Sequence, residues 1–405
     1  MESFFKGTIF FLLLCTISCS SVSETEDQQV IPEEDKQVNT VIELGAEKSK
    51  LPRVLFNDIQ KIMEGSTSTI IFDNIVSYIN AAPEQSSIYV SIYLFEYAPI
   101  IDALIKASER NVQLFLMTDN SERSDNQSTI NKFRSLNGNV EVVGVTNDAS
   151  SIAINHNKFI LFSEIEAEGG ETLRNIVFQT SQNFHSKGQK KLQDAVIISN
   201  HGLFNAYVEY YNKMKSHALY GMEDFEYFEY LNSSNKVKVC FYPKRKNGET
   251  YGEDSVIEIL DQITNPSGTS FKIAMSDWSD SRSYIIDELI RLSDSGATIE
   301  VITKSGKGPE VMRGLKILED RGEFVKVFNM NSSGPAKINI HTKIMLVDGV
   351  LDGNEQKFVM TGTQNFTLNA LWNNNETSLF LMDSNLIEEY ENFLNELKEL
   401  PGIDL

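Results

Sequence analysis

Cysteine and histidine are scarce in this chain. Of 405 residues only three are cysteines, and because Cys15 and Cys19 lie near the start, the body has the single thiol of Cys240. The body therefore cannot form an internal disulfide, which excludes a disulfide-stapled scaffold and a four-cysteine zinc site. The five histidines form no cluster with carboxylates at a recognisable metal-ligand spacing. We expect no metal and no other cofactor.

Positive charge is also in short supply. Lysine and arginine number 36 against 57 aspartates and glutamates, a formal net charge of −21. A negative net charge argues against a protein that binds nucleic acid through its overall electrostatic field. It does not exclude binding through a local basic cleft. Hydrophobic residues make up 41% of the chain, enough to bury real cores, so a disordered or fibrous protein is excluded.

Long apolar runs are missing except near the start. Gly7 to Ile17 is nearly free of polar groups, but it is shorter than the roughly 20 residues that cross about 30 Å of hydrocarbon. With Lys6 before it and small residues after it, the run predicts a signal peptide over residues 1–18. Thr16-Ile17-Ser18-Cys19 resembles a bacterial lipobox, whose cysteine becomes lipidated, although such boxes usually carry Leu where Thr16 stands. Ordinary cleavage without a lipid is the alternative.

Residues 19–52 are rich in Ser, Glu, Asp, Gln and Lys and poor in large apolar residues, so they predict a disordered acidic tether. Leader and tether together predict an exported protein. It is expected on the outer face of a bacterial membrane as a lipoprotein, or secreted.

The remaining chain contains an internal repeat. Residues 100–105, Ile-Ile-Asp-Ala-Leu-Ile, match residues 285–290, Ile-Ile-Asp-Glu-Leu-Ile, 185 positions later. The same displacement takes Val54 to Val239. A register shared over more than a hundred residues predicts two copies of one fold.

Each copy alternates short β-rich runs with amphipathic stretches. This alternation predicts an α/β fold of two pseudo-twofold-related lobes, each a mostly parallel sheet covered by helices on both faces, with one active site at the lobe interface. We place the first lobe at 53–220 and the second at 221–405. The first three strands of each lobe are expected at 88–95, 112–117 and 140–145, and at 271–275, 299–303 and 324–328.

Two of the five histidines fall on the repeat. His156 and His341 lie 185 positions apart, and each is followed at the second position by a lysine, Lys158 or Lys343. Because side chains two apart on a strand share a face, each lobe is expected to present imidazole and ammonium side by side. A hydroxyl, an amide and a carboxylate follow in each copy: Ser181, Asn183 and Asp194 in the first, and Thr363, Asn365 and Glu376 in the second.

These side chains suit a phosphodiester. Its transition state places negative charge on the oxygens of a five-coordinate phosphorus, which ammonium and amide donors stabilise. Two imidazoles in opposite protonation states can supply the nucleophile and the acid. We expect Asp194 and Glu376 to orient the rings, and the hydroxyls of Ser181 and Thr363 to bind the substrate.

The motifs resemble those of the phospholipase D superfamily, which carries two copies of His-x-Lys-x(4)-Asp followed by Gly-Ser-x-Asn. The second copy here has the whole pattern, with Thr for Ser: His341, Lys343, Asp348, Gly362, Thr363 and Asn365. The first copy departs at Ser163, where the family has Asp, and at Thr180, where it has Gly. The pair Asp348-Gly349 is typical of a turn, so we expect the Asp348 carboxylate to stabilise the end of a strand. In the first copy Ser163 replaces this aspartate, and we expect that replacement to affect stability more than chemistry.

The resemblance implies a phosphohistidine intermediate, with His156 as the nucleophile and His341 as the general acid. The leading hypothesis is a monomeric phospholipase D-like phosphodiesterase that acts on phospholipid headgroups at a membrane. A metal-independent nuclease of the same superfamily is the alternative, which the charge of −21 disfavours. A non-catalytic binding protein with a degenerate first motif is the third.

Overall fold

The computed structural model describes residues 51–136, 138–167, 169–218, 221, 224–231, 237–330, 337–403 and 405. They all belong to the compact unit Val41–Leu405. The predicted signal peptide, Cys19 and nearly all of the predicted tether lie outside the described residues, as does residue 220 at the predicted lobe boundary. None of the described helices is both long and apolar enough to cross a bilayer.

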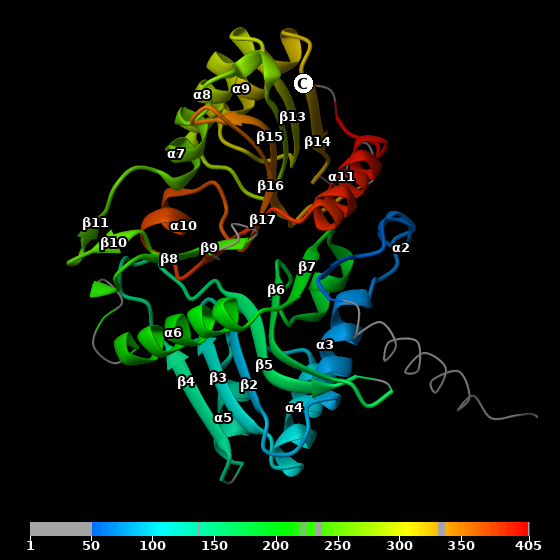
Figure 1. Ribbon diagram of the computed structural model, residues 1–405, viewed down its shortest axis with the longest axis vertical. Helices are drawn as coiled ribbons and strands as arrows, with labels where there is room; N and C mark the ends of the chain where they lie inside the picture. The colour runs from blue at the N-terminus through cyan, green and yellow to red at the C-terminus, as the bar shows by residue number, and fades with distance from the viewer. Residues whose placement is uncertain are drawn as a thin grey trace, which may run out of the picture. The chain divides into compact units, whose positions relative to one another are not determined.

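The first lobe is a seven-stranded sheet with helices on both faces (Figure 1). Its strand order is β1-β7-β6-β5-β2-β3-β4. The strands are β1 (Arg53–Phe56), β2 (Ser87–Ile92), β3 (Gln113–Asp119), β4 (Val140–Val145), β5 (Lys158–Glu166), β6 (Thr172–Thr180) and β7 (Asp194–Ser199). The helices are α2 (Ile59–Met63), α3 (Ile70–Asn80), α4 (Ala98–Glu109), α5 (Gln127–Arg134) and α6 (His201–His217).

The second lobe repeats this plan in an eight-stranded sheet of order β14-β13-β12-β15-β16-β17-β9-β8. The strands are β8 (Phe228–Leu231), β9 (Val237–Phe241), β12 (Ser270–Met275), β13 (Thr298–Lys304), β14 (Phe324–Phe328), β15 (Lys343–Leu351), β16 (Asn354–Gly362) and β17 (Thr377–Leu381). The helices are α7 (Ser255–Asp261), α8 (Tyr284–Asp294), α9 (Pro309–Asp320), α10 (Leu368–Trp372) and α11 (Ser384–Lys398). A separate two-stranded ribbon joins β10 (Arg245–Lys246) to β11 (Glu249–Thr250).

The two-lobed α/β fold predicted from the sequence is confirmed, but the sheets are mixed instead of mostly parallel. In each lobe only the three strands linked through helices run parallel, β2-β3-β4 and β12-β13-β14. The remaining pairs are antiparallel, and in two of them, β5-β6 and β15-β16, a short turn between consecutive strands reverses the chain. The repeat is visible in the pairing: β1 pairs with β7 as β9 pairs with β17.

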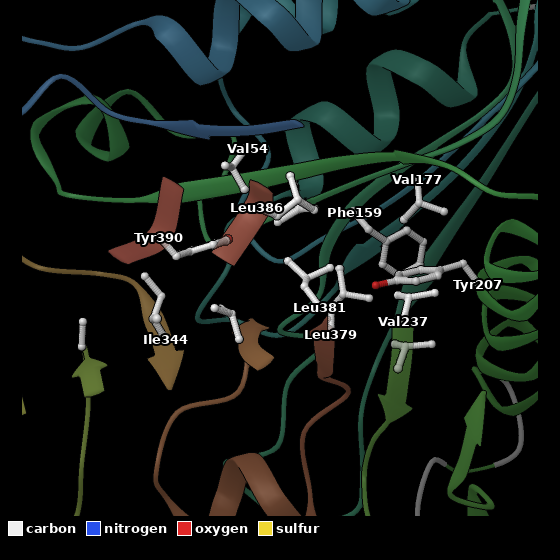
Figure 2. Packing of buried hydrophobic residues seen from close by; sticks show 14 of the residues in the cluster. Val54, Phe159, Val177, Tyr207, Val237, Ile344, Leu379, Leu381, Leu386 and Tyr390 are labelled. Atoms are coloured by element: carbon white, nitrogen blue, oxygen red, sulfur yellow. The ribbon is translucent and has the colours of Figure 1, made fainter. Parts of the chain in front are cut away.

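Each sheet has one core of its own, and the two lobes share a third. In the first lobe α3 and α4 cover one face of the sheet, where Ile75 and Leu104 are fully buried. In the second lobe α8 and α9 do the same. The opposite faces of both sheets contribute to one common cluster with α6 and α11. Figure 2 shows its meeting point, with Phe159 of β5 and Tyr207 of α6 close to Leu379 of β17.

Candidate active site

The backbones of both motif histidines are held by the opposite lobe. His156 donates its backbone N–H to the carbonyl of Asn375 at 2.9 Å, just before β17. His341 donates its backbone N–H to the carbonyl of Leu192 at 2.8 Å, just before β7. The two histidines precede β5 and β15 respectively, so both lie where the lobes meet.

His156 has a carboxylate partner. Its Nδ1 lies 2.8 Å from Oε2 of Glu376, whose other oxygen accepts from the Asn374 amide at 3.0 Å. An ionised carboxylate only accepts, so Nδ1 carries the proton and Nε2 has the free lone pair. Burial lowers the pKa of His156, and Lys158 lowers it further against the opposing effect of Glu376. The ring is neutral and oriented.

His341 has no carboxylate at the equivalent position. Its Nδ1 lies 3.2 Å from the carbonyl oxygen of Ser181, which also accepts only. Burial holds the pKa of His341 well below its usual value, and the ammonium groups of Lys343, Lys191 and Lys158 lower it further. The two imidazoles, equivalent in sequence, therefore differ in their electrostatic surroundings.

The motif lysines lie against their own histidines. The ammonium groups of Lys158 and Lys343 donate to the carbonyls of His156 and His341, each at 2.6 Å. Both side chains are buried. Burial lowers the pKa of Lys343 to about 7, and the ammonium groups of Lys304 and Lys191 lower it further against the opposing effect of Asp277. Burial also holds the pKa of Lys158 well below its usual range, and Lys343 lowers it further against the opposing effect of Glu376. A bound phosphate dianion or monoanion would reverse this effect and restore their charge.

The two asparagines differ in their contacts. Asn183 accepts the backbone N–H of Leu94 at 3.2 Å through Oδ1, which leaves its NH₂ group to donate. The Oδ1 atom of Asn365 is buried and has no hydrogen-bond partner in the described part of the chain.

The hydroxyls of Ser181 and Thr363 are engaged within the protein. Ser181 donates to Oδ1 of Asp194 at 2.7 Å, and Thr363 accepts the backbone N–H of Thr377 at 3.0 Å. Both residues are buried. The structure gives these hydroxyls a role in holding strands together, in place of the substrate contact predicted from the sequence.

Asp194 also differs from its predicted role, because it faces hydroxyls instead of an imidazole. Besides Ser181, it accepts from Thr361 at 2.5 Å and Tyr390 at 2.9 Å, both through Oδ2. The second lobe supplies these two hydroxyls from β16 and α11. These hydroxyls satisfy the hydrogen-bonding capacity of the carboxylate, and Asp194 is only 1% exposed. Asp194 links the lobes and does not orient a ring.

Asp348 lies away from the histidines. It pairs with Lys357 across β15 and β16 at 3.2 Å, and its side chain is 51% exposed. The predicted turn at Asp348-Gly349 is wrong, because β15 continues to Leu351. At the equivalent place in the first lobe, the Ser163 hydroxyl accepts the backbone N–H of Ser87 at 2.8 Å and so ties β5 to β2.

Several residues near the histidines were missed by sequence reasoning. The Tyr93 ring lies 5.5 Å from that of His156, and buried Asp119 accepts the backbone N–H of Asn155 at 2.7 Å. On the His341 side, Asp277 lies 3.4 Å from Lys304 and 3.5 Å from Lys307. The repeat could have pointed to two of these residues, because the displacement of 185 relates Asp119 in the first lobe to Lys304 in the second.

The described residues contain no group of three or more His, Cys, Asp or Glu side chains arranged to hold a metal ion. The charged groups that act on the pKa values of the two histidines are lysines and Glu376, and Asp277 acts on the neighbouring Lys343.

Comparison with known proteins gives one family. Residues 75–215 and 259–398 match the family described as "Cardiolipin synthase, PLD-like domain", one copy in each lobe. No curated protein matches the chain.

Two solved structures share the fold. The phosphatidylserine synthase of Haemophilus influenzae Rd KW20 superposes with a TM-score of 0.58 at 12% identity, covering 89% of this chain and 91% of that chain. The polyphosphate kinase of Porphyromonas gingivalis superposes with a TM-score of 0.54 at 15% identity, covering 91% of this chain and 53% of that one. The chain therefore spans about half the length of the kinase. At these identities the likeness establishes the fold alone.

Proposed function

The chain belongs to the phospholipase D superfamily, through its two cardiolipin synthase-type PLD-like domains, and we propose that it cleaves phospholipid headgroups through a phosphohistidine intermediate. The observation that carries the proposal is the His156–Glu376 pair at 2.8 Å beside two buried lysines. It combines an oriented nucleophile with two fixed lysine side chains, whose positive charge a bound phosphate favours, for the phosphoryl oxygens.

In the first step, Nε2 of His156 attacks phosphorus and forms a P–N bond as the P–O bond to the leaving group breaks. The imidazole becomes cationic when it is phosphorylated at Nε2, because Nδ1 keeps its proton. Glu376 stabilises that charge, which favours His156 over His341 as the nucleophile. The leaving oxygen takes a proton from His341.

In the second step, water or an alcohol attacks the phosphohistidine, and the P–N bond breaks. His341, now neutral, accepts the proton of the attacking hydroxyl and is ready for the next cycle. Water gives hydrolysis, whereas an alcohol gives transfer. The residues of the site serve both outcomes equally.

His341 must be protonated to act as the acid, and its pKa in the free protein is well below its usual value after burial and the nearby lysines. A bound phosphodiester brings a negative charge close to Lys158 and Lys343. That charge offsets the lysines and raises the pKa of His341. Substrate binding thus prepares the acid.

A lipid substrate is supported by the match to cardiolipin synthase and by the phosphatidylserine synthase fold, since both names refer to phospholipids. A nuclease is the second candidate. The basic groups beside His341 favour it locally, but the net charge of −21 opposes a long nucleic acid.

The test is a substrate panel assayed in EDTA with wild-type protein and the His156→Asn variant. Headgroup release from phospholipid vesicles, with no cleavage of oligonucleotides and no activity in the variant, supports the proposal. Cleavage of oligonucleotides alone favours the nuclease, and binding without turnover of any diester favours the non-catalytic protein. Activity that EDTA removes and a divalent ion restores would contradict the two-histidine mechanism.

We further propose, from the sequence of the leader, that the protein is exported and lipidated at Cys19. A diacylglyceryl group would hold the active site close to a phospholipid surface. Mass spectrometry of the native N-terminus tests this. A mature chain with a free amino terminus and no lipid would contradict it.

A further inference from the structure

The surroundings of the two histidines differ in charge although the fold repeats. Asp119 ends β3 and contacts the backbone beside His156, whereas Lys304 occupies the same position at the end of β13. Glu376 contacts His156 and has no counterpart on His341. At these two positions the His156 side therefore has the carboxylates of Asp119 and Glu376, whereas the His341 side has the ammonium group of Lys304.

Lys304 is positioned next to the second motif. It donates to the hydroxyl of Ser276 at 3.1 Å, and Ser276 donates its backbone N–H to the carbonyl of Thr342 at 2.9 Å. Thr342 lies between His341 and Lys343 in the chain. The Lys304 side chain is 14% exposed, so a ligand can reach it.

Lys191 approaches His341 from the first lobe. It precedes Leu192, whose carbonyl accepts the His341 backbone N–H. Among the described residues its ammonium group has no ion pair or hydrogen bond. The charge of Lys191 acts on groups of both motifs, because it lowers the pKa of His341 in the second motif and that of Lys158 in the first.

In the described part of the chain, the carboxylate that pairs with lysines here is that of Asp277. Asp277 contacts Lys304 at 3.4 Å and Lys307 at 3.5 Å. Lys307 is a supporting residue, since its side chain is 3% exposed and donates to the Ser276 carbonyl at 2.5 Å. Asp277 cannot neutralise both of these lysines and Lys191 as well, so the His341 side keeps an excess of positive charge.

We propose that Lys191 and Lys304 form a subsite that binds a second anionic group of the substrate, in addition to the phosphodiester. This second group belongs to the phosphorus substituent that lies on the His341 side. This inference rests on the proposed function, in which that substituent is the leaving group in the first step and the acceptor in the second. The substrate class is a phosphodiester whose headgroup carries a further phosphate or carboxylate. A cationic headgroup such as choline would lie against two lysines and be disfavoured.

The test measures binding by calorimetry with three small probes that are not phosphodiesters. Glycerol 3-phosphate fills the catalytic position alone, glycerol 1,3-bisphosphate adds a phosphate, and 3-phosphoglycerate adds a carboxylate. Lys191→Gln and Lys304→Gln remove the subsite lysines. Lys190→Gln is the matched control, because it removes the same charge from an exposed position one residue away.

We expect wild-type protein and the Lys190→Gln control to bind at least one of the two probes with a second anionic group about 10-fold or more tighter than glycerol 3-phosphate. Each subsite variant should reduce this preference to about threefold or less, with little change for glycerol 3-phosphate. A preference for the bisphosphate assigns the subsite to phosphate, and a preference for 3-phosphoglycerate assigns it to carboxylate. No preference in wild type, or equal weakening of all probes in the variants, would overturn the proposal.

The two proposals fail in different ways. If wild-type protein shows the lysine-dependent preference but cleaves no phosphodiester, the subsite stands and the proposed function is wrong. If it cleaves phosphatidylcholine as well as acidic phospholipids and lacks the preference, the function stands and the subsite is wrong.

Discussion

At the residue scale, the chemistry depends on which imidazole has the carboxylate. Glu376 lies in the second lobe and contacts His156 of the first, so the pair crosses the lobe interface. It fixes the tautomer that exposes Nε2 and stabilises the cation formed by phosphorylation. Among the described residues, the Nδ1 atom of His341 faces the Ser181 carbonyl at 3.2 Å and the Lys343 ammonium group at 3.5 Å, and no carboxylate, so the ring can change its protonation state when substrate binds.

Replacing Glu376 by Gln should lower kcat by about 10²–10⁴-fold, as loss of an orienting carboxylate does in other imidazole catalysts. Because Glu376 raises the pKa of His156 against the effect of burial, its removal should lower that pKa further. His156 must be neutral to attack, so the acid limb of kcat/KM against pH should move to lower pH. Asp194→Asn is the control, and its acid limb should not move. An unchanged limb in Glu376→Gln would remove His156 from the nucleophile role.

The loss of kcat caused by replacing His341 with Asn should depend on the leaving group. For an alkyl diester, loss of the acid should lower kcat by about 10²–10⁴-fold. For bis(p-nitrophenyl) phosphate, whose leaving group needs no proton, the loss should be about tenfold or less. Peptide mapping should find the phosphoryl adduct on His156, and His156→Asn should show no rescue. An adduct on His341 would exchange the two roles.

Much of the site was predictable from residue spacing alone. His156, Lys158, His341 and Lys343 were found because the repeat places them in register, and the structure brings them together at the interface. The partner of each carboxylate was not predictable. Glu376 reaches across the interface, and Asp194 is held by Tyr390 from a helix almost two hundred residues later.

At the scale of elements, local periodicity predicted the strands and helices well, and topology less well. The parallel part of each sheet follows from the βα alternation, since β2 and β3 are joined through α4. The antiparallel part depends on turn lengths between successive strands, which periodicity does not report. The prediction that Asp348 ends a strand was wrong because periodicity does not show where a turn begins, and β15 continues to Leu351.

Asp194 joins three elements, β7, β16 and α11, through hydroxyl hydrogen bonds. Asp194→Asn should lower the free energy of unfolding by about 2–4 kcal/mol, because one donor-acceptor match is lost in a buried network. Asp348→Asn is the matched control and should lower it by about 1 kcal/mol or less, since its pair with Lys357 is half exposed. Urea unfolding of both variants checks this. Equal effects of the two substitutions would contradict the linking role of Asp194.

At the scale of the whole molecule, the repeat predicted two lobes, and the structure adds that, besides the core of its own, each lobe contributes one face of its sheet to a core that both lobes share. The face of the first sheet that carries Phe159 and Val177 packs in the same cluster as Leu379 and Leu381 of the second (Figure 2). The histidine backbones are also held across the interface. Stability and the active site therefore depend on the same lobe contacts.

This shared core predicts a single unfolding transition for the described part of the chain. Leu379 is 1% exposed in the shared cluster, and Leu379→Ala should lower the free energy of unfolding by about 2–5 kcal/mol. Ile75→Ala acts in the core between the first sheet and α3, which belongs to the first lobe alone, and should have an effect of similar size. Differential scanning calorimetry should show that both variants move one and the same transition, and loss of activity on heating should follow it.

Independent lobes would behave differently. The wild-type trace would then contain two transitions, and Ile75→Ala would shift only that of the first lobe. Such a result would contradict the coupling inferred from the shared core. A single transition that moves with either substitution means that the contacts which place Glu376 against His156 are lost only when the fold itself is lost, so the pair keeps its geometry throughout the temperature range of the native state.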